Sequence, residues 1–249
     1  MDLNRIGYHG ERVQESPGQL NLTDNPLIRL ITLCILYVAQ GIPYGFVTIT
    51  FVSYLSEKGE TVAAIGTVTA MSTLPWTFKW VWGPIIDRWG IPAMGRRRPW
   101  ILAAQLGMTL TIVTMAFVPD PSLNLTLIGW LVFGHNIFNS LQDVSVDALA
   151  VDLLRESERG RVNGFMYGSK FFGMFLGGAF LSQMVAEDGL SIAFTIQVFM
   201  LAAIMLFPLF LRERAGEKLL PWTKGSVQLQ SNQQLANNVH QLFGFLKRA

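Results

Sequence analysis

The chain has 249 residues, of which 51% are hydrophobic and 14% are charged, and its formal net charge is +2. Soluble globular domains carry roughly 25% charged residues, so this composition excludes an ordinary soluble domain and predicts a protein solvated by lipid. The basic residues are spread over separate loops rather than gathered in one patch, which argues against a nucleic-acid partner.

Six hydrophobic blocks follow a polar segment at the start of the chain. We expect residues 1–27 to form a cytoplasmic tail without a cleaved signal peptide. Each block is close to the roughly 20 residues that cross a hydrocarbon core as a helix. The sequence therefore predicts an all-α membrane protein with spans at about 28–55, 62–86, 99–118, 123–150, 162–185 and 190–211.

The residues after the sixth span are polar again. We expect residues 212–249 to form a cytoplasmic linker that contains an amphipathic helix on the membrane surface. The apolar residues at helical spacing in this segment are Val227, Leu235, Val239, Leu242, Phe243 and Leu246.

The distribution of Lys and Arg predicts the orientation. If the N-terminus is cytoplasmic, the outer loops contain only Lys58, and nearly all other basic residues lie in the inner loops. Cytoplasmic loops retain positive charge during insertion, so both termini are expected in the cytoplasm. The lone Cys34 in span one is interpreted as a small apolar residue rather than a disulfide partner or metal ligand.

A glycine- and arginine-rich loop connects spans two and three. It reads Gly83-Pro84-Ile85-Ile86-Asp87-Arg88-Trp89-Gly90, and after the insert 91–94 it continues Gly95-Arg96-Arg97-Arg98-Pro99-Trp100. The pattern Gly-x-x-x-Asp-Arg-x-Gly resembles the signature loop of the major facilitator superfamily, although the insert departs from the common pattern. A generic positive-inside loop is the alternative interpretation.

This resemblance implies a gate on the cytoplasmic face. In the family the glycine permits close helix contact, and the charged residues form a latch that opens and closes. The predicted gate residues are Gly83, Asp87, Arg88, Gly90, Arg96, Arg97 and Arg98.

Three further segments resemble one branch of that superfamily. They are Gln40-Gly41-Ile42-Pro43-Tyr44, the run from Leu74 to Pro84 with Lys79 at its centre, and Gln142-Asp143-Val144-Ser145-Val146-Asp147-Ala148. Together they are similar to the AmpG-type muropeptide permeases and to the related acetyl-CoA transporters. The resemblance implies the N-terminal six-helix half of a major facilitator fold.

Charged residues inside three spans are expected at one depth. Lys79, Asp143 and Lys170 each lie eight residues from the cytoplasmic end of their span, or roughly 12 Å at 1.5 Å per residue. One interpretation is a proton-titrated Asp143 whose pairing with Lys79 or Lys170 changes during transport; the other is a static ion pair. Asp147 lies one turn nearer the cytoplasm, and this position favours a structural or latch role for it.

Polar stripes run along spans one and four. Tyr37, Gln40, Tyr44 and Thr48 form the first stripe, and His135 and Asn139 join Asp143 and Asp147 in the second. They predict a solute pathway, although any single member is more often a hydrogen bond between helices. In span five, a packing face is predicted from Gly164, Gly168, Gly173, Gly177 and Gly178.

The favoured function is a proton-coupled secondary transporter half for a sugar-containing solute such as a muropeptide, in the inner membrane of a bacterial cell. The expected partners are the lipid bilayer, a small solute, protons and a second six-helix half that is a separate chain, a second copy or lost by truncation. The alternatives are a sucrose-type disaccharide/proton symporter half and a truncated remnant that binds a membrane partner.

An enzyme is not expected. The sequence shows no Ser-His-Asp arrangement, no metal-ligand spacing and no phosphate-binding glycine loop followed by Lys. We therefore expect no catalytic residue, no metal and no cofactor.

Overall fold

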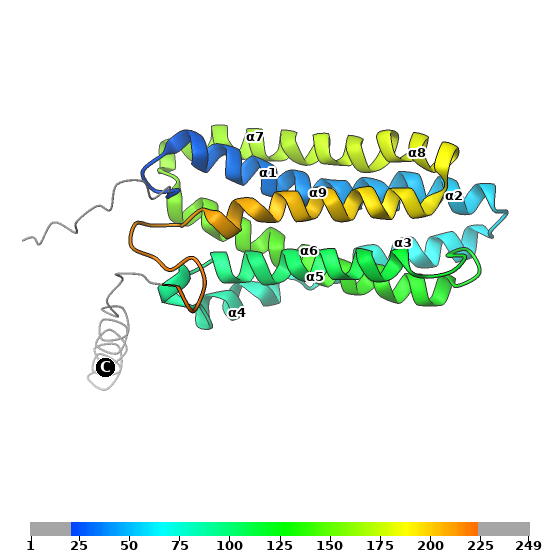
Figure 1. Cartoon of the computed structure of the whole chain (residues 1–249), viewed down its shortest axis with the longest axis horizontal. Helices are drawn as coiled ribbons and strands as arrows, with labels where there is room; N and C mark the ends of the chain where they lie inside the picture. The colour runs from blue at the N-terminus through cyan, green and yellow to red at the C-terminus, as the bar shows by residue number, and fades with distance from the viewer. Residues whose placement is uncertain (1–20, 224–249) are drawn as a thin grey trace, which may run out of the picture.

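The computed structural model describes residues 21–223, with only the backbone described at Pro92. Long helices run side by side along the length of the molecule (Figure 1). The predicted all-α membrane fold is confirmed for this part of the chain. Most of the predicted N-terminal tail and the predicted amphipathic helix lie outside the described residues.

The first helical segment is continuous from Pro26 to Glu57. It consists of α1 (Pro26–Gly45), a π-helical stretch (Phe46–Phe51) and α2 (Val52–Glu57). The Asn25 side chain accepts hydrogen bonds from the backbone N–H groups of Leu27 and Ile28, and Pro26 occupies the first turn. An asparagine cap followed by proline satisfies the free N–H groups and preorganises the helix start.

The remaining helices follow with short connections. The second segment is broken, because α3 ends at Thr77 and a 3₁₀ turn, Lys79–Val81, separates it from α4. The other bounds are α3 (Val62–Thr77), α4 (Trp82–Arg88), a 3₁₀ turn (Pro92–Met94), α5 (Arg98–Ala116), α6 (Leu125–Leu153), α7 (Glu156–Phe175), a π-helical stretch (Leu176–Phe180), α8 (Leu181–Asp188) and α9 (Leu190–Phe210).

Within residues 21–223, three segments are both long and apolar enough to cross a membrane by themselves: Pro26–Glu57, Arg98–Ala116 and Leu190–Phe210. The α6 helix is longer, with 29 residues, but it contains Asp143, Asp147 and several amides. Polar side chains inside a bundle lower the mean hydropathy without preventing a span. The division into six spans and the flanking segments therefore stays a prediction.

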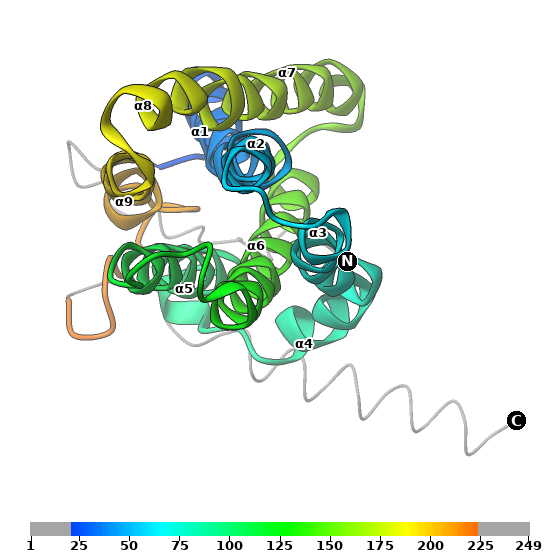
Figure 2. The same ribbon diagram turned by 90° about the vertical axis from the view of Figure 1, so that its right-hand side faces the viewer.

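The α6 helix lies at the centre of the arrangement. Seen end-on, it has α5 on one side and α3 on the other, while α1 packs against α7 and α9 lies against α5 (Figure 2). Its buried positions extend from Ile128 to Ala150. Asp143, which lies within this range, is therefore surrounded by other helices.

The closest backbone contact joins α1 to α7 and the π-helical stretch after it. A Cβ atom at Gly41 would lie 2.1 Å from the Lys170 carbonyl oxygen, and one at Gly177 would lie 1.8 Å from the Ile42 carbonyl oxygen. Only glycine permits this approach. Cβ atoms at Gly164 and Gly168 would meet no described atom within 4 Å, so the expected packing face covers only the second half of this segment.

A glycine substitution tests this contact. Gly177→Ala should destabilise the folded chain by about 1–3 kcal/mol, because the added methyl group forces α1 away. Gly168→Ala is the matched control and should be neutral or slightly stabilising, since alanine favours helix. Thermal unfolding in detergent micelles measures both variants, and equal unfolding temperatures would contradict the proposed close contact.

Candidate functional site

Two lysines share one carboxylate inside the bundle. The Lys79 Nζ atom lies 3.1 Å from Asp143 Oδ2, and the Lys170 Nζ atom lies 3.6 Å from Asp143 Oδ1. The Asp143 side chain is 6% exposed, whereas the Lys79 and Lys170 side chains are 46% and 20% exposed. The structure thus brings together the three charged residues that the sequence places at one depth.

Three different elements position these charges. Lys79 begins the 3₁₀ turn between α3 and α4, and Asp143 lies in the central α6 helix. Lys170 lies on α7, where its own carbonyl group is in contact with Gly41 of α1. The ion-pair layer therefore depends on how α3, α6 and α7 pack, and on the glycine contact that holds α7 against α1.

Aromatic rings surround the two ammonium groups. The Lys170 Nζ atom lies 4.9 Å from the centroid of the Trp76 ring and 5.8 Å from that of Tyr37, while Lys79 lies 5.9 Å from Trp76. The Trp76 indole N–H donates to Asn136 at 3.0 Å, which fixes the orientation of the ring. Ring faces attract cations, so these contacts hold the ammonium groups in the layer.

Asp147 lies in a separate environment on the same helix. It accepts a hydrogen bond from the Tyr37 hydroxyl, and the Tyr37 and Tyr167 rings meet edge-on with centroids 5.7 Å apart. These residues line a pocket of about 220 Å³ that also contains Arg159 and Asn163. Asp147 is thus engaged by a tyrosine rather than by a lysine.

The predicted polar stripes are mostly buried. Gln40, His135 and Asn139 are at most 2% exposed, whereas Tyr44 is exposed and Thr48 donates to the Tyr44 carbonyl at 2.7 Å. His135 Nδ1 is 2.9 Å from the Thr111 hydroxyl. Within residues 21–223, the Gln40 and Asn139 amides have no hydrogen-bond partner. That these side chains line a solute pathway stays a prediction.

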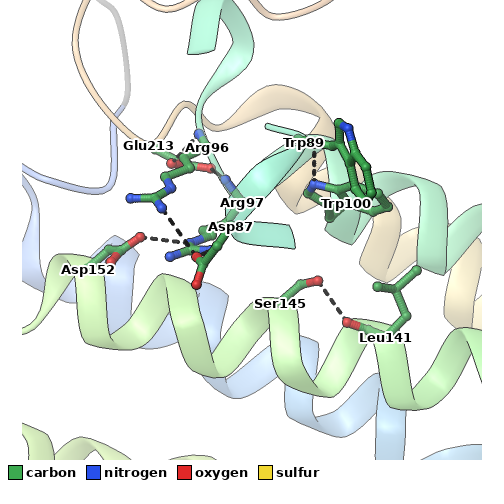
Figure 3. Close-up of polar contacts among 9 residues, drawn as sticks. All are labelled: Asp87, Trp89, Arg96, Arg97, Trp100, Leu141, Ser145, Asp152 and Glu213. Carbon is green, nitrogen blue, oxygen red and sulfur yellow. Dashed lines mark hydrogen bonds and ion pairs between the residues drawn. The ribbon is translucent and has the colours of Figure 1, made fainter. Parts of the chain in front are cut away.

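Charged residues at the ends of α4 and α6 form a second cluster (Figure 3). Asp87 Oδ1 lies 2.6 Å from Arg97 Nη1 and 3.3 Å from Arg96 Nη2. The Arg97 Nε atom also donates to Asp152 at 2.8 Å. Arg97 therefore joins the end of α4 to the end of α6, and its side chain is only 8% exposed.

Other residues of the predicted gate lie outside this cluster. The buried Arg98 guanidinium donates to main-chain carbonyl groups, including those of Leu209 and Leu219, and so holds the segment after α9. Arg88 is exposed and lies over the Trp89 ring. A Cβ atom at Gly83 would meet no described atom within 4 Å, whereas one at Gly90 would lie 3.4 Å from the Arg96 carbonyl oxygen.

Two glutamates after α9 complete this end of the bundle. Glu213 accepts hydrogen bonds from the backbone N–H groups of Arg96, Arg97 and Arg98, where α5 begins. Glu217 accepts from the backbone N–H groups of Glu213 and Arg214. Sequence reasoning missed Glu213 and Asp152, because neither stands at a motif spacing.

Burial changes the acidity of both glutamates. It raises the pKa of Glu217 to about 7, with a further increase from the nearby Glu213 carboxylate. Burial also raises the pKa of Glu213, although its three backbone N–H donors act in the opposite direction. Each group therefore holds its proton more tightly in the folded chain than in the unfolded one.

The amino-acid sequence also matches known proteins. Residues 33–246 match the Major Facilitator Superfamily. The match covers most of the chain, so the chain belongs to this superfamily of integral membrane proteins, and the predicted family is confirmed.

Particular relatives support the predicted AmpG-type branch. The Rickettsia felis transporter named AmpG 4 is 25% identical over 198 residues, which are 77% of this chain and 47% of that protein. The Escherichia coli K12 anhydromuropeptide permease is 30% identical over 132 residues, or 53% of this chain and 26% of the permease. The Rickettsia prowazekii AmpG 3 is 30% identical over 155 residues, or 59% and 36%. The chain spans about half the length, or less, of these relatives.

A double-mutant cycle tests the ion pair. Lys79→Gln and Asp143→Asn should each destabilise the chain, but their combination should cost less than the sum by about 0.5–3 kcal/mol. Asp143→Asn leaves Lys79 without its partner, and Lys79→Gln leaves Asp143 with Lys170 alone, so both single variants lose the same interaction. Unfolding in mixed detergent micelles gives the free energies. In the control cycle, Lys58→Gln, beyond the end of α2, takes the place of Lys79→Gln. Its effect on the free energy of unfolding should add to that of Asp143→Asn. Coupling of equal size in both cycles would refute the pairing.

The acidity of Glu217 leads to a second prediction. Its folded pKa of about 7 lies above its ordinary value of 4.5, so stability should fall as the pH rises between these values. Glu217→Gln should remove the part of this slope that lies near pH 7. Unfolding temperatures recorded from pH 5 to pH 8 check the effect, and parallel curves for variant and unaltered chain would contradict it.

Proposed function

We propose that this chain is the N-terminal six-helix half of a proton-coupled secondary transporter for a sugar-containing solute such as a muropeptide. It works by alternating access in the inner membrane of a bacterial cell, with both termini in the cytoplasm. Its role is transport rather than catalysis. The superfamily and the anhydromuropeptide permease among its relatives support this assignment.

The observation that carries the coupling proposal is the carboxylate of Asp143 between two ammonium groups. An ionisable group at membrane depth is costly and usually serves an ion or proton pathway. Asp143 is almost completely buried, whereas both lysines are partly exposed. A proton on Asp143 removes one charge and so weakens both ion pairs at once, which links protonation to the packing of α3, α6 and α7.

Aromatic side chains support a solute that contains a sugar. Trp76 is half-buried beside the ion-pair layer, and Tyr44 and Trp80 are exposed. Flat aromatic faces provide apolar area for a sugar ring, while the neighbouring lysines provide hydrogen-bond donors.

A second six-helix half is proposed as the partner. The alignment covers 47% of the Rickettsia felis relative, and alternating access needs two bundles that rock against each other around a central site. The exposed Phe171, Phe172 and Phe175 of α7 and Phe78 and Trp80 near the end of α3 are apolar surface available to such a partner or to lipid.

The cytoplasmic cluster is the proposed gate. Asp87, Arg96, Arg97 and Asp152 join the ends of α4 and α6, and the basic residues there agree with a cytoplasmic location. Opening would separate Asp87 from Arg97, and the exposed position of Asp87 allows this at small cost.

Substitution of Asp143 tests the proposal. The completed transporter is this chain together with its second six-helix half, reconstituted in liposomes. There, Asp143→Asn should abolish accumulation of a labelled anhydromuropeptide against its gradient, because an asparagine amide cannot take up and release the coupled proton as a carboxylate does. Exchange of labelled for unlabelled solute at equal concentration should continue, since it needs no net proton movement.

Asp120→Asn, in the loop between α5 and α6, is the matched control and should accumulate the solute normally. Full accumulation by Asp143→Asn would rule out this residue as the proton site. Absence of accumulation by the unaltered transporter, with both the anhydromuropeptide and sucrose as solutes, would reject the transport assignment itself.

A further inference from the structure

The ion-pair layer contains balanced charges when Asp143 is ionised. Lys79 and Lys170 provide two positive charges, and Asp143 and Asp147 provide two negative ones when both carboxylates are ionised. The Tyr37 and Tyr167 hydroxyl groups also face the layer from α1 and α7, and Arg159 of α7 lines the pocket next to Asp147.

A proton on Asp143 leaves this layer with one excess positive charge. The charge of Asp147 is already counted in this balance, and its carboxylate is engaged by the Tyr37 hydroxyl, so it supplies no further compensation. The two ammonium groups then keep only their contacts with the rings of Trp76 and Tyr37. An uncompensated charge at membrane depth is costly, so this state favours an anion beside the lysines.

On this basis we propose that Lys79 and Lys170 bind a carboxylate of the transported solute, which replaces the carboxylate of Asp143 when that residue takes up a proton. The inference rests on the proposed transport function and names the class of its solute. One proton and one solute anion then enter together, and the layer has zero net charge both before and after binding. The transport step is electroneutral for a solute with a single negative charge.

Exposure distinguishes this arrangement from a static clamp. The Lys79 side chain is 46% exposed while that of its partner is 6% exposed, so Lys79 reaches the surface of the bundle and Asp143 does not. A clamp between helices requires one lysine for one carboxylate. Two lysines that share one acid can instead both pair with a solute carboxylate when that acid is neutral.

The pocket beside the layer offers the anion a further cation. It has a volume of about 220 Å³ and connects Tyr37, Asp147 and Tyr167 with Arg159 and Asn163. The Arg159 Nη2 atom donates to the Val151 carbonyl, while its buried Nε atom has no partner among residues 21–223. A carboxylate that leaves the lysines towards the cytoplasm can accept a hydrogen bond there.

The experiment uses the completed transporter in liposomes with two labelled probes. One probe is 1,6-anhydro-N-acetylmuramic acid, a sugar with one carboxylate, and the other is its neutral methylamide. An inside-negative potential of about 100 mV shifts the accumulation ratio by about 50-fold for each net positive charge that enters. We expect the acid, driven by a pH gradient, to be unaffected by this potential, and the amide to accumulate more strongly.

Lysine variants supply a second readout. Lys79→Gln should raise the half-saturating concentration of the acid about tenfold or more, since a charged hydrogen bond is lost, and should change that of the amide less than about twofold. Lys79→Arg should retain the preference for the acid. Lys58→Gln, at an exposed position after α2, is the matched control and should resemble the unaltered transporter.

Each result bears on the inference. A potential-dependent accumulation of the acid, or an equal effect of Lys79→Gln on both probes, would overturn the anion site while leaving proton-coupled transport intact. The potential measurement needs no variant, so a Lys79→Gln chain that fails to fold does not prevent the test. If neither probe accumulates in the unaltered transporter, the proposed function fails together with the inference.

Discussion

The Asp143 carboxylate is the constraint on which this structure depends. A buried carboxylate needs compensation, and here Lys79 and Lys170 provide it from two other elements at 3.1 and 3.6 Å. The pair ties α6 to the turn after α3 and to α7. In the proposed function, a proton on Asp143 would weaken this interaction, and this links coupling to the packing of the same three elements.

The glycine contact between α1 and α7 supports that layer. Backbone approach at Gly41 and Gly177 leaves no room for side chains. It sets the position of Lys170, whose carbonyl group is part of the contact, and it brings Tyr37 close to both Lys170 and Asp147. The close packing of these glycines therefore determines where the charge of Lys170 is located. In lipid, the association of helices depends on such close packing of small residues rather than on the hydrophobic effect.

The ends of the helices are organised by a different principle. Arg97 bridges the acidic groups of Asp87 and Asp152, and Glu213 accepts from the first N–H groups of α5. Helix N-termini favour negative charge, so Glu213 fixes the segment after α9 without requiring a lysine or arginine partner. Arg98 contributes from the opposite direction, since its guanidinium donates to the Leu209 carbonyl at the end of α9 and to the Leu219 carbonyl in that same segment.

The class of this protein and its superfamily could be predicted from the sequence. Composition and the hydrophobic blocks determined the all-α membrane class, and residues 83–100 and 142–148 indicated the superfamily and its branch. A common depth for Lys79, Asp143 and Lys170 was predicted from the helical rise, because the expected depth of a residue follows from its position along its span.

Tertiary structure alone decided the contacts. It showed that both lysines meet Asp143 and that Tyr37 engages Asp147. It also showed that Asp152 and Glu213 contact the arginines at the start of α5. It also separated Arg98 from Asp87 and left Gly164 and Gly168 in open space. The physical reason is that helical periodicity specifies which residues share a face, whereas the rotation and approach of neighbouring helices specify which faces meet.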